Sequence, residues 1–371
     1  MMAEDYAILV GIGKYGDRNT FPELQGPIND VQIVKDWLTS PTGGGISNPE
    51  KNIVQILSPT EEVPPNTPLY EYPPVALEFD NAFKQLVTDG NGEFVARPDS
   101  RLYLYFSGHG FCDKKSLTAQ ATLYAANATR NFPENIFGTQ YALNVQDKAL
   151  FSEIVLIMDC CRDAEINRPP SIPTINQAGN GAAGTVKLLC IYAAPKGGKA
   201  QERAFPERDG KVHGLLTHAV LKAFAEARPE NGNSLSGSAL KKHLLATWSA
   251  ICGDIPAAAP EIVLPTGEDI FFHSQNKGVL QIFEFTKPLL QATTLNIIDG
   301  QGNSVVHCDF LPPPATSFTT GNDGEPTPLD FDGKAFSLRL QPSYYKYVLS
   351  GDLQGSSLFA VEVEGGPNVK L

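Results

Sequence analysis

Two short polar motifs, each directly after a β-rich apolar run, hold the residues best suited to covalent chemistry. The first is Ser-Gly-His-Gly at 107–110 and the second is Asp-Cys-Cys-Arg at 159–162. A thiol is a good nucleophile only as thiolate, so it needs a nearby base or a positive environment. His109 is suited to act as general base toward Cys161. The two motifs therefore predict nucleophilic catalysis, with the backbone N–H groups of Gly110 and Cys161 facing the oxyanion.

The adjacent Cys160 is the rival nucleophile. Side chains alternate in extended backbone, so the two cysteines should face opposite ways, with Cys160 pointing into the fold. Packing is the simpler role for either residue, since lone cysteines are most often buried and inert. Only the pairing of the two motifs at matching strand ends favours a role for Cys161 in chemistry.

The first ~270 residues alternate short apolar runs with helical patterns, which predicts a mostly parallel sheet with helices on both faces. Ligands of such sheets bind beyond the carboxyl ends of the strands, where both motifs lie. The expected strands are 6–12, 52–57, 101–106, 153–158, 187–192 and part of 262–272, and the expected helices are 29–38, 75–87, 214–227 and 238–251.

The C-terminal part has a different character. After about residue 275 the helical periodicity disappears, and short strand-like runs alternate with turns such as Asp299-Gly300. We therefore expect an α/β domain over 1–274 and an all-β sandwich over 275–371, either immunoglobulin-like or prealbumin-like. The stretch 164–186 is rich in Pro, Gly and Asn, which predicts a long surface loop.

Composition excludes several classes of protein. The 371 residues carry a formal net charge of −12, which argues against nucleic acid or an anionic membrane surface as the main partner. None of the six cysteines forms a Cys-x-x-Cys pair, so we expect no structural zinc, no disulfide framework and a reducing, cytoplasmic setting. No apolar run approaches 18 residues and the N-terminus lacks a basic start, so we expect neither membrane span nor signal peptide.

The two motifs, together with Leu24-x-Gly26-x-x-Asn29-Asp30, resemble the caspase, metacaspase and paracaspase superfamily over about residues 5–272. The interval between the histidine and the cysteine is close to that of the caspase pattern. The resemblance implies a caspase-like three-layer α/β/α sandwich. It also implies a cysteine endopeptidase that forms a thioester acyl-enzyme through a Cys161/His109 dyad, without an obligatory third member.

The resemblance further implies which residues bind substrate. In metacaspases and paracaspases the acid two residues before the nucleophile selects arginine or lysine, and Asp159 stands at that position. A carboxylate pairs well with a guanidinium, so we expect a protein or peptide substrate cut after Arg, with Lys weaker. The alternative is that Asp159 only caps a turn. Ala193, Ala194 and Pro195 stand where the family pairs substrate backbone by strand addition.

The chain departs from the family in two places. Cys161 is followed by Arg-Asp-Ala at 162–164 instead of the His-Ser-Gly of metacaspases, which is closer to the paracaspase style. The second pocket acid of the family has no clear match in 192–198. Lys196 or Lys199 stands there instead, and Glu202 is the candidate for the missing charge.

Activation is the next expectation. Caspase-like enzymes often mature by a cut after the nucleophile, but the only basic residue in 164–186 is Arg168, and Pro169 follows it. Proline after a scissile bond disrupts strand-like binding, so we expect activity without a cut there, with Arg203 and Arg208 as the better sites. Calcium is a possible activator by analogy with metacaspases. The chain has no EF-hand-like loop, and a looser acidic site stays open.

Two other functions compete with peptidase activity. The first is a catalytically silent caspase-fold binding or scaffold module, although such a module needs neither His109 nor Cys161. The second is nucleotide binding by Gly11-Ile-Gly13-Lys-Tyr-Gly16, which matches the dinucleotide fingerprint. That site requires a helix starting within the glycines, and the expected helix begins only near Asn29. The sequence names no partner for the C-terminal domain.

Overall fold

The computed structural model describes residues 4–59, 61–165, 170–173, 175, 181–227, 234–273, 279–287, 292–300, 302–310, 316–320, 327–328, 331, 334–340, 343–351, 353–361 and 368–371. The chain divides into two compact units: the first contains residues up to His273, apart from 228–234, and the second contains the β strands that follow. The sequence placed this boundary between residues 274 and 275. Among the described residues, no helix is long and apolar enough to cross a membrane.

A six-stranded sheet forms the centre of the first unit, in the order β13-β9-β7-β3-β1-β2. Neighbouring strands are parallel except β13, which is antiparallel to β9 at one edge. The strands are β1 (Tyr6–Gly11), β2 (Ile53–Leu57), β3 (Arg97–Gly108), β7 (Phe151–Cys160), β9 (Lys187–Tyr192) and β13 (Glu261–Val263).

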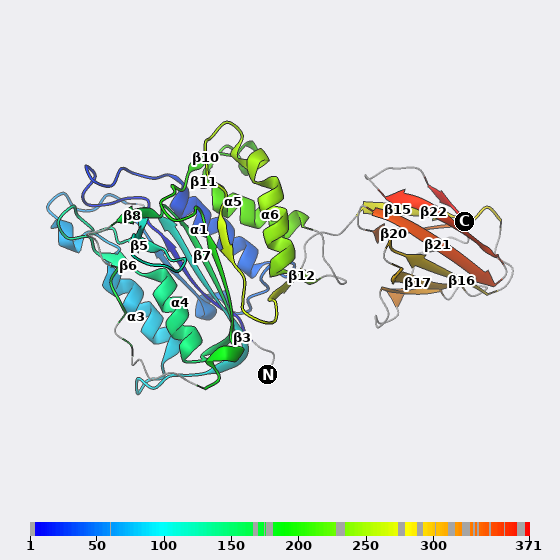
Figure 1. Ribbon diagram of the computed structural model, residues 1–371, viewed down its shortest axis with the longest axis horizontal. Coiled ribbons are helices and arrows are strands. Elements are labelled where there is room, and N and C mark those ends of the chain that lie inside the picture. Colours follow the sequence, from blue (N-terminus) through cyan, green and yellow to red (C-terminus); the bar gives the residue numbers. More distant parts are fainter. Residues whose placement is uncertain are drawn as a thin grey trace. The chain divides into compact units, whose positions relative to one another are not determined.

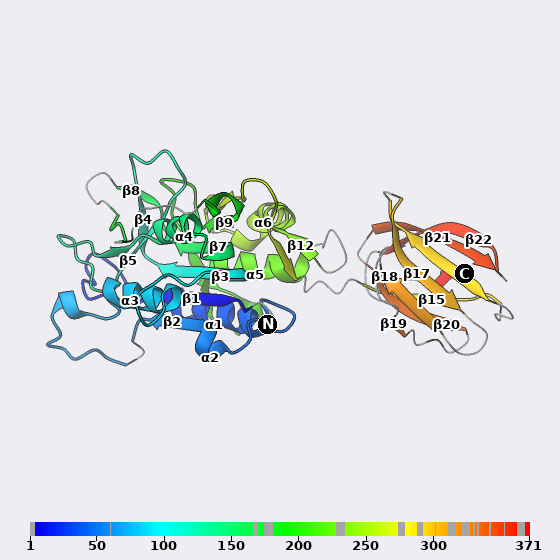
Figure 2. The same cartoon turned by 90° about the horizontal axis from the view of Figure 1, so that it is seen from below.

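Helices cover both faces of this sheet, with α3 and α4 on one side and α1, α5 and α6 on the other (Figure 1). Their bounds are α1 (Gly26–Thr39), α2 (Pro49–Asn52), α3 (Ala76–Val87), α4 (Gly138–Asp147), α5 (Leu215–Glu226) and α6 (Gly237–Cys252). The α/β/α sandwich expected from the alternating pattern is thereby confirmed. Figure 2 shows the same layers from below.

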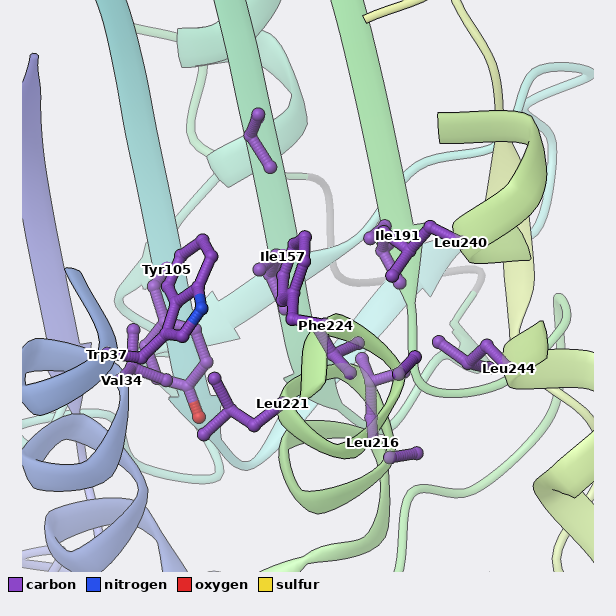
Figure 3. Packing of buried hydrophobic residues seen from close by; sticks show 14 of the residues in the cluster. Val34, Trp37, Tyr105, Ile157, Ile191, Leu216, Leu221, Phe224, Leu240 and Leu244 are labelled. Atoms are coloured by element: carbon purple, nitrogen blue, oxygen red, sulfur yellow. The ribbon is translucent and has the colours of Figure 1, made fainter. Parts of the chain in front are cut away.

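Side chains of one strand alternate between two cores. Leu9 of β1 packs with α1 and α5, whereas its neighbour Val10 packs with α3 and α4. The first core contains Trp37 of α1 stacked on Phe224 of α5, with ring centroids 4.3 Å apart (Figure 3). Such fully apolar strands, covered on both faces, are what a parallel sheet requires.

Smaller strands lie around the sheet. Two groups lie at the carboxyl ends of its strands, and a third lies near the start of β3, where the Arg101 guanidinium donates to the carbonyl oxygen of Phe271. One group forms a four-stranded sheet, β6-β5-β4-β8, and two others form two-stranded pairs, β10-β11 and β12-β14. Their bounds are β4 (Gly110–Asp113), β5 (Thr122–Tyr124), β6 (Asn135–Ile136), β8 (Asp163–Glu165), β10 (Glu202–Ala204), β11 (Val212–Gly214), β12 (Ser234–Ser236) and β14 (Phe271–His273). Three short 3₁₀ helices are η1 (Leu69–Glu71), η2 (Ala183–Thr185) and η3 (Pro206–Arg208).

The start of α1 decides whether the glycines at 11–16 form a dinucleotide-binding site. Helix α1 begins at Gly26 with Pro27 in its first turn, a favoured position for proline. The glycines of 11–16 end β1 and form the connection that follows, well before that helix. No helix N-terminus therefore starts within them, as the fingerprint would require.

The second unit is all-β, as the sequence predicted. Two sheets, β20-β15-β23 and β19-β18-β17-β16-β21-β22, share one core that contains Phe283, Phe310 and Phe336. The strands are β15 (Val279–Glu284), β16 (Thr293–Ile298), β17 (Ser304–Phe310), β18 (Thr316–Thr320), β19 (Thr327–Pro328), β20 (Ala335–Leu340), β21 (Ser343–Gly351), β22 (Gly355–Val361) and β23 (Val369–Lys370).

Candidate active site

The register of β3 and β7 fixes the position of the two candidate catalytic residues. Gly108 of β3 lies opposite Cys160 of β7 in a parallel pair. His109 and Cys161 are the next residues of each strand, so both leave the sheet at the same edge, side by side. Both side chains are partly buried. The structure thus places the two residues that the sequence singled out directly after neighbouring strand ends, and their action as a catalytic dyad stays a prediction.

His109 is held by its backbone and by one ring nitrogen. Its N–H donates to the Tyr15 hydroxyl at 2.9 Å, and Nε2 lies 2.8 Å from the carbonyl oxygen of Pro22. A carbonyl only accepts, so Nε2 carries a hydrogen and the neutral ring has its lone pair on Nδ1. Burial lowers the pKa of His109. The imidazole is therefore neutral at pH 7, and Nδ1 is free of a proton, as a general base must be.

Gly108 makes this position of His109 possible. Its φ is 153°, and a Cβ there would lie 2.8 Å from both the carbonyl oxygen of Ile12 and the Tyr15 hydroxyl. A side chain at Gly108 would therefore displace the segment that holds the imidazole.

The two cysteines differ in exposure. Cys160 is fully buried beneath Gly110, and burial raises its pKa well above the usual value for a thiol. Cys161 is partly exposed, with Sγ 3.8 Å from the carbonyl oxygen of Ala200, and burial raises its pKa as well. Cys161 is thus the thiol that reagents can reach. Its raised pKa means that it needs a base to become a nucleophile.

Gly110 and Cys161, the candidate oxyanion donors, follow the two strand ends directly. Gly110 begins β4 and lies opposite Leu123 of β5. The assignment of their N–H groups to the oxyanion stays a prediction.

Asp159 is buried behind the nucleophile. One carboxylate oxygen, Oδ2, accepts hydrogen bonds from the N–H of Thr217 at 2.9 Å and from its hydroxyl at 2.6 Å. Thr217 lies in the first turn of α5, where backbone N–H groups lack partners within the helix. Asp159 thus caps a helix, a role close to the structural alternative that the sequence left open.

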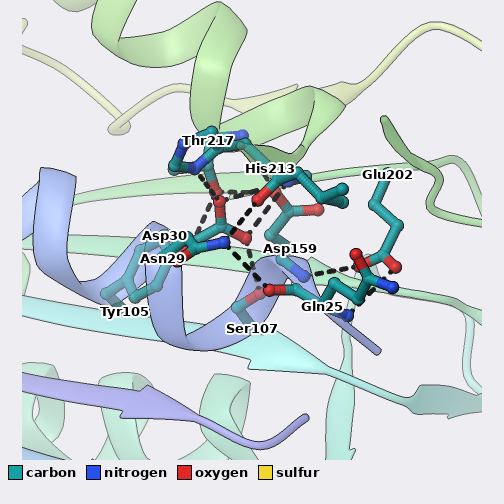
Figure 4. Close-up of polar contacts among 12 residues, drawn as sticks. Gln25, Asn29, Asp30, Tyr105, Ser107, Asp159, Glu202, His213 and Thr217 are labelled. Atoms are coloured by element: carbon teal, nitrogen blue, oxygen red, sulfur yellow. Dashed lines mark hydrogen bonds and ion pairs between the residues drawn. The ribbon is translucent and has the colours of Figure 1, made fainter. Parts of the chain in front are cut away.

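Asp30 is the residue that sequence reasoning missed. It entered only as part of the motif at 24–30, yet its carboxylate lies in the same buried network as Asp159 (Figure 4). Its Oδ2 accepts from the Ser107 hydroxyl at 3.0 Å, and its Oδ1 lies 2.9 Å from Nδ1 of His213 and 3.1 Å from the N–H of Gly214.

Burial dominates the electrostatics of this pair. It raises the pKa of Asp30 to about 8. It also raises the pKa of Asp159 to about 7, and the neighbouring Asp30 adds to that shift. Among the described residues, no lysine or arginine forms an ion pair with either carboxyl, and the one ion-pair partner is His213. Burial lowers the pKa of His213, so it is neutral at pH 7. The pair consequently lacks a permanent counter-charge.

Glu202 of β10 is a third acid at this position. Its carboxylate accepts from the N–H groups of Gln25 at 3.1 Å and Gly26 at 2.9 Å, at the start of α1. Its negative charge raises the pKa of both Asp30 and Asp159. The candidate proposed from the sequence for the missing pocket charge therefore lies beside the other two acids.

The Arg162 side chain is buried and makes its contacts within the protein. Its buried guanidinium donates to the carbonyl oxygens of Gln120 at 2.8 Å and Ala194 at 2.9 Å, pairs with Glu261, and lies over the Tyr192 ring. It thus ties the segment after the nucleophile to β9 and β13.

Residues 193–195 are partly engaged within the protein. The N–H of Ala193 donates to the carbonyl oxygen of Met158 at 3.0 Å, and the carbonyl of Ala194 accepts from Arg162. Pro195 is exposed, and its carbonyl accepts from Gly198. Substrate binding by strand addition here stays a prediction.

The remaining basic residues lie as follows. Lys196 donates to the carbonyl oxygen of Lys114 at 2.6 Å, so it points away from the three acids. Arg203 lies in β10, opposite His213 of β11, and Arg208 lies in η3. Arg168 lies outside the described residues. Among the residues described, no group of three or more His, Cys, Asp or Glu side chains could hold a metal ion.

Comparison with known proteins places the chain in a family. Residues 4–243 match the family described as Caspase domain. A probable protease from a Desulfuromonadales bacterium is 21% identical over 231 residues, which cover 59% of this chain and 25% of that protein. The chain thus spans a quarter of that relative's length. The crystal structure of caspase-1 from Spodoptera frugiperda matches with a TM-score of 0.48 and 10% identity, over 75% of this chain and 93% of that one.

Proposed function

The chain belongs to the caspase family of cysteine peptidases, and on that basis we propose that it is an endopeptidase that cuts peptide bonds after arginine, and more slowly after lysine. One observation carries the specificity. Asp30, Asp159 and Glu202 converge at the end of the strand that leads to Cys161, and no described lysine or arginine neutralises the two buried carboxyls.

The proposed chemistry uses two side chains. Nδ1 of His109 takes the proton from Cys161 Sγ as the sulfur attacks the scissile carbonyl carbon, and the N–H groups of Gly110 and Cys161 stabilise the oxyanion. The C–N bond then breaks, and His109 gives the proton to the leaving amine. A water molecule, deprotonated by His109, then attacks the thioester carbon, the C–S bond breaks, and His109 returns the proton to the Cys161 sulfur as the carboxylic acid product leaves. The neutral imidazole and the raised thiol pKa support this order, because no preformed thiolate is needed.

Charge decides between substrate classes. A guanidinium supplies the positive charge that the buried acids lack, and its planar N–H donors can bind a carboxylate bidentately. A lysine ammonium supplies the charge without that geometry, so it should bind less well. An aspartate side chain would bring a negative charge beside these acids, which the site disfavours. The inward, structural placement of Arg162 supports the same conclusion, because this cation does not face the three acids.

Hydrolysis of fluorogenic peptides that end in Arg, Lys or Asp tests the proposal. Wild type should cut the Arg peptide fastest and the Asp peptide not measurably, and Cys161→Ala should cut none. Each assay is run with calcium and with a chelator, which tests activation by calcium independently. Preference for the Asp peptide would refute the specificity. No turnover of any peptide in either condition would favour the silent scaffold module.

A further inference from the structure

The imidazole of His213 contacts Asp30, and the proposed chemistry does not use this ring. His213 lies in β11, is fully buried, and shares a hydrogen bond with Asp30 through Nδ1 at 2.9 Å. Its other ring nitrogen, Nε2, is buried and has no hydrogen-bond partner among the described residues. The ring is therefore held by a single hydrogen bond, whereas in water both nitrogens would have partners.

The other neighbours of Asp30 leave little room for a substrate. The Ser107 hydroxyl takes Oδ2, and the N–H of Gly214 lies within 3.2 Å of both oxygens. Asp30 is 0% exposed and Asp159 is 5% exposed, so a guanidinium cannot reach either carboxyl unless a neighbouring group moves. Ser107 belongs to a central strand, and Gly214 contributes backbone at the start of α5. His213 contributes only a side chain, from the short β10–β11 hairpin.

We propose that His213 is a further specificity-determining residue, which occupies the bond to Asp30 in the empty site and is displaced when the cationic side chain of the substrate binds. This inference rests on the proposed cleavage after arginine. The exchange is favourable because a guanidinium brings a positive charge to the carboxylate, whereas the neutral imidazole brings only an N–H donor. Acids and uncharged side chains cannot make that exchange, so His213 restricts the pocket to cations.

The charges around the ring fit this role. Asp30 contacts it from α1, and Asp30 in turn interacts with the charges of Asp159 from β7 and Glu202 from β10. Arg208 and Lys211 also act on it, and their positive charges lower its pKa. The imidazole therefore stays neutral at pH 7 and does not itself supply the missing cation.

Binding of benzamidine, an amidinium with the donors of arginine, tests the proposal by calorimetry on full-length Cys161→Ala. Adding His213→Ala should tighten binding about tenfold, the scale of one hydrogen bond to a charged group, because the competing donor is gone. In the active enzyme the same substitution should lower KM for the Arg peptide and leave kcat nearly unchanged. His213→Gln, which keeps a donor, should restore the wild-type KM.

Asn29→Ala is the matched control. It removes a different bond between the hairpin and α1, from Asn29 Nδ2 to the carbonyl oxygen of Val212 at 3.0 Å. Benzamidine affinity should then change less than twofold. Equal tightening in Asn29→Ala would show that loosening of the hairpin is the cause, and it would overturn the role of His213. Unchanged or weaker binding in folded His213→Ala would also overturn it.

A measurement on the unaltered ring covers the case in which His213→Ala does not fold. With ¹⁵N-labelled histidine, the Nδ1 chemical shift of His213 should change on saturation with benzamidine, because its bond to Asp30 breaks. If the Nδ1 chemical shift is the same in the free and the saturated protein, His213 is not displaced, and this result would leave the proposed cleavage after arginine unaffected. No benzamidine binding and no Arg cleavage would instead remove the proposed function and this inference with it.

Discussion

Replacing Asp30 by asparagine should stabilise the protein at neutral pH while it impairs cleavage after arginine. The pKa of Asp30 is raised from an ordinary value of 3.8 to about 8 by burial. Between these values the unfolded chain binds fewer protons than the folded one, so the free energy of unfolding falls as the pH rises. The asparagine side chain cannot ionise, and the variant should lose this contribution.

The magnitude follows from the same shift. Each pH unit within the window costs about 1.4 kcal/mol for one such group, so raising the pH from 6 to 7.5 should cost wild type about 2 kcal/mol through Asp30 alone. Other groups, among them Asp159, His109 and His218, also titrate on unfolding. The contributions of His109 and His218 are common to both proteins. The substitution also removes the part of the Asp159 shift that Asp30 causes, so the difference between wild type and Asp30→Asn reports on the coupled acid pair.

Urea unfolding at several pH values measures this difference directly. The stability of Asp30→Asn relative to wild type should rise by about 2 kcal/mol between pH 6 and 7.5. Asp36→Asn, which alters an exposed carboxyl on the same helix, should follow the wild-type curve. Parallel curves for wild type and Asp30→Asn would refute a buried, ionisable Asp30. The Arg peptide provides the second readout, and kcat/KM should fall at least tenfold because a charged hydrogen-bond partner is lost.

Three further predictions concern the catalytic edge. Iodoacetamide should modify Cys161 and spare Cys160 in the native protein, since only Cys161 is accessible; equal labelling by peptide mass spectrometry would contradict the assignment. The lowered pKa of His109 should place the acid limb of kcat/KM below pH 6.5, and a limb above that value would speak against a neutral buried base. Arg162→Met should lower the free energy of unfolding by about 3–5 kcal/mol, because it leaves buried carbonyls and Glu261 without their partner. Glu261→Gln should cost less in the same urea assay, since its side chain is partly exposed.

The layered fold and the shared edge of His109 and Cys161 were predictable because both depend on local patterns. A buried parallel strand is marked by an uninterrupted apolar run, and β1, β3, β7 and β9 each contain one. Two motifs that directly follow such strands must lie at one edge of the sheet. That β3 and β7 are neighbours in the sheet, with Gly108 opposite Cys160, does not follow from the motifs themselves. Before the structure, only the family resemblance indicated it.

The sequence predicted only part of the acid site, because its residues come from distant parts of the chain. Asp30 meets Gly214 and His213 across more than 180 positions, and no local pattern encodes that contact. One signal was nonetheless available. Asp30 precedes Val34 by four positions and Leu38 by eight, so it lies on the buried face of α1, where an acid costs stability unless it has a function or a partner.

That cost explains the arrangement of the site. Asp30 accepts the N–H of Gly214, the N-cap of α5, and Asp159 accepts the N–H of Thr217 in its first turn, so the positive end of one helix offsets part of the burial of both acids. The helix supplies only partial charge, and the raised pKa values show that the deficit remains. A protein selected for stability alone would have apolar residues here. The cost of burying the two acids therefore supports the proposal that a cation arrives with the substrate.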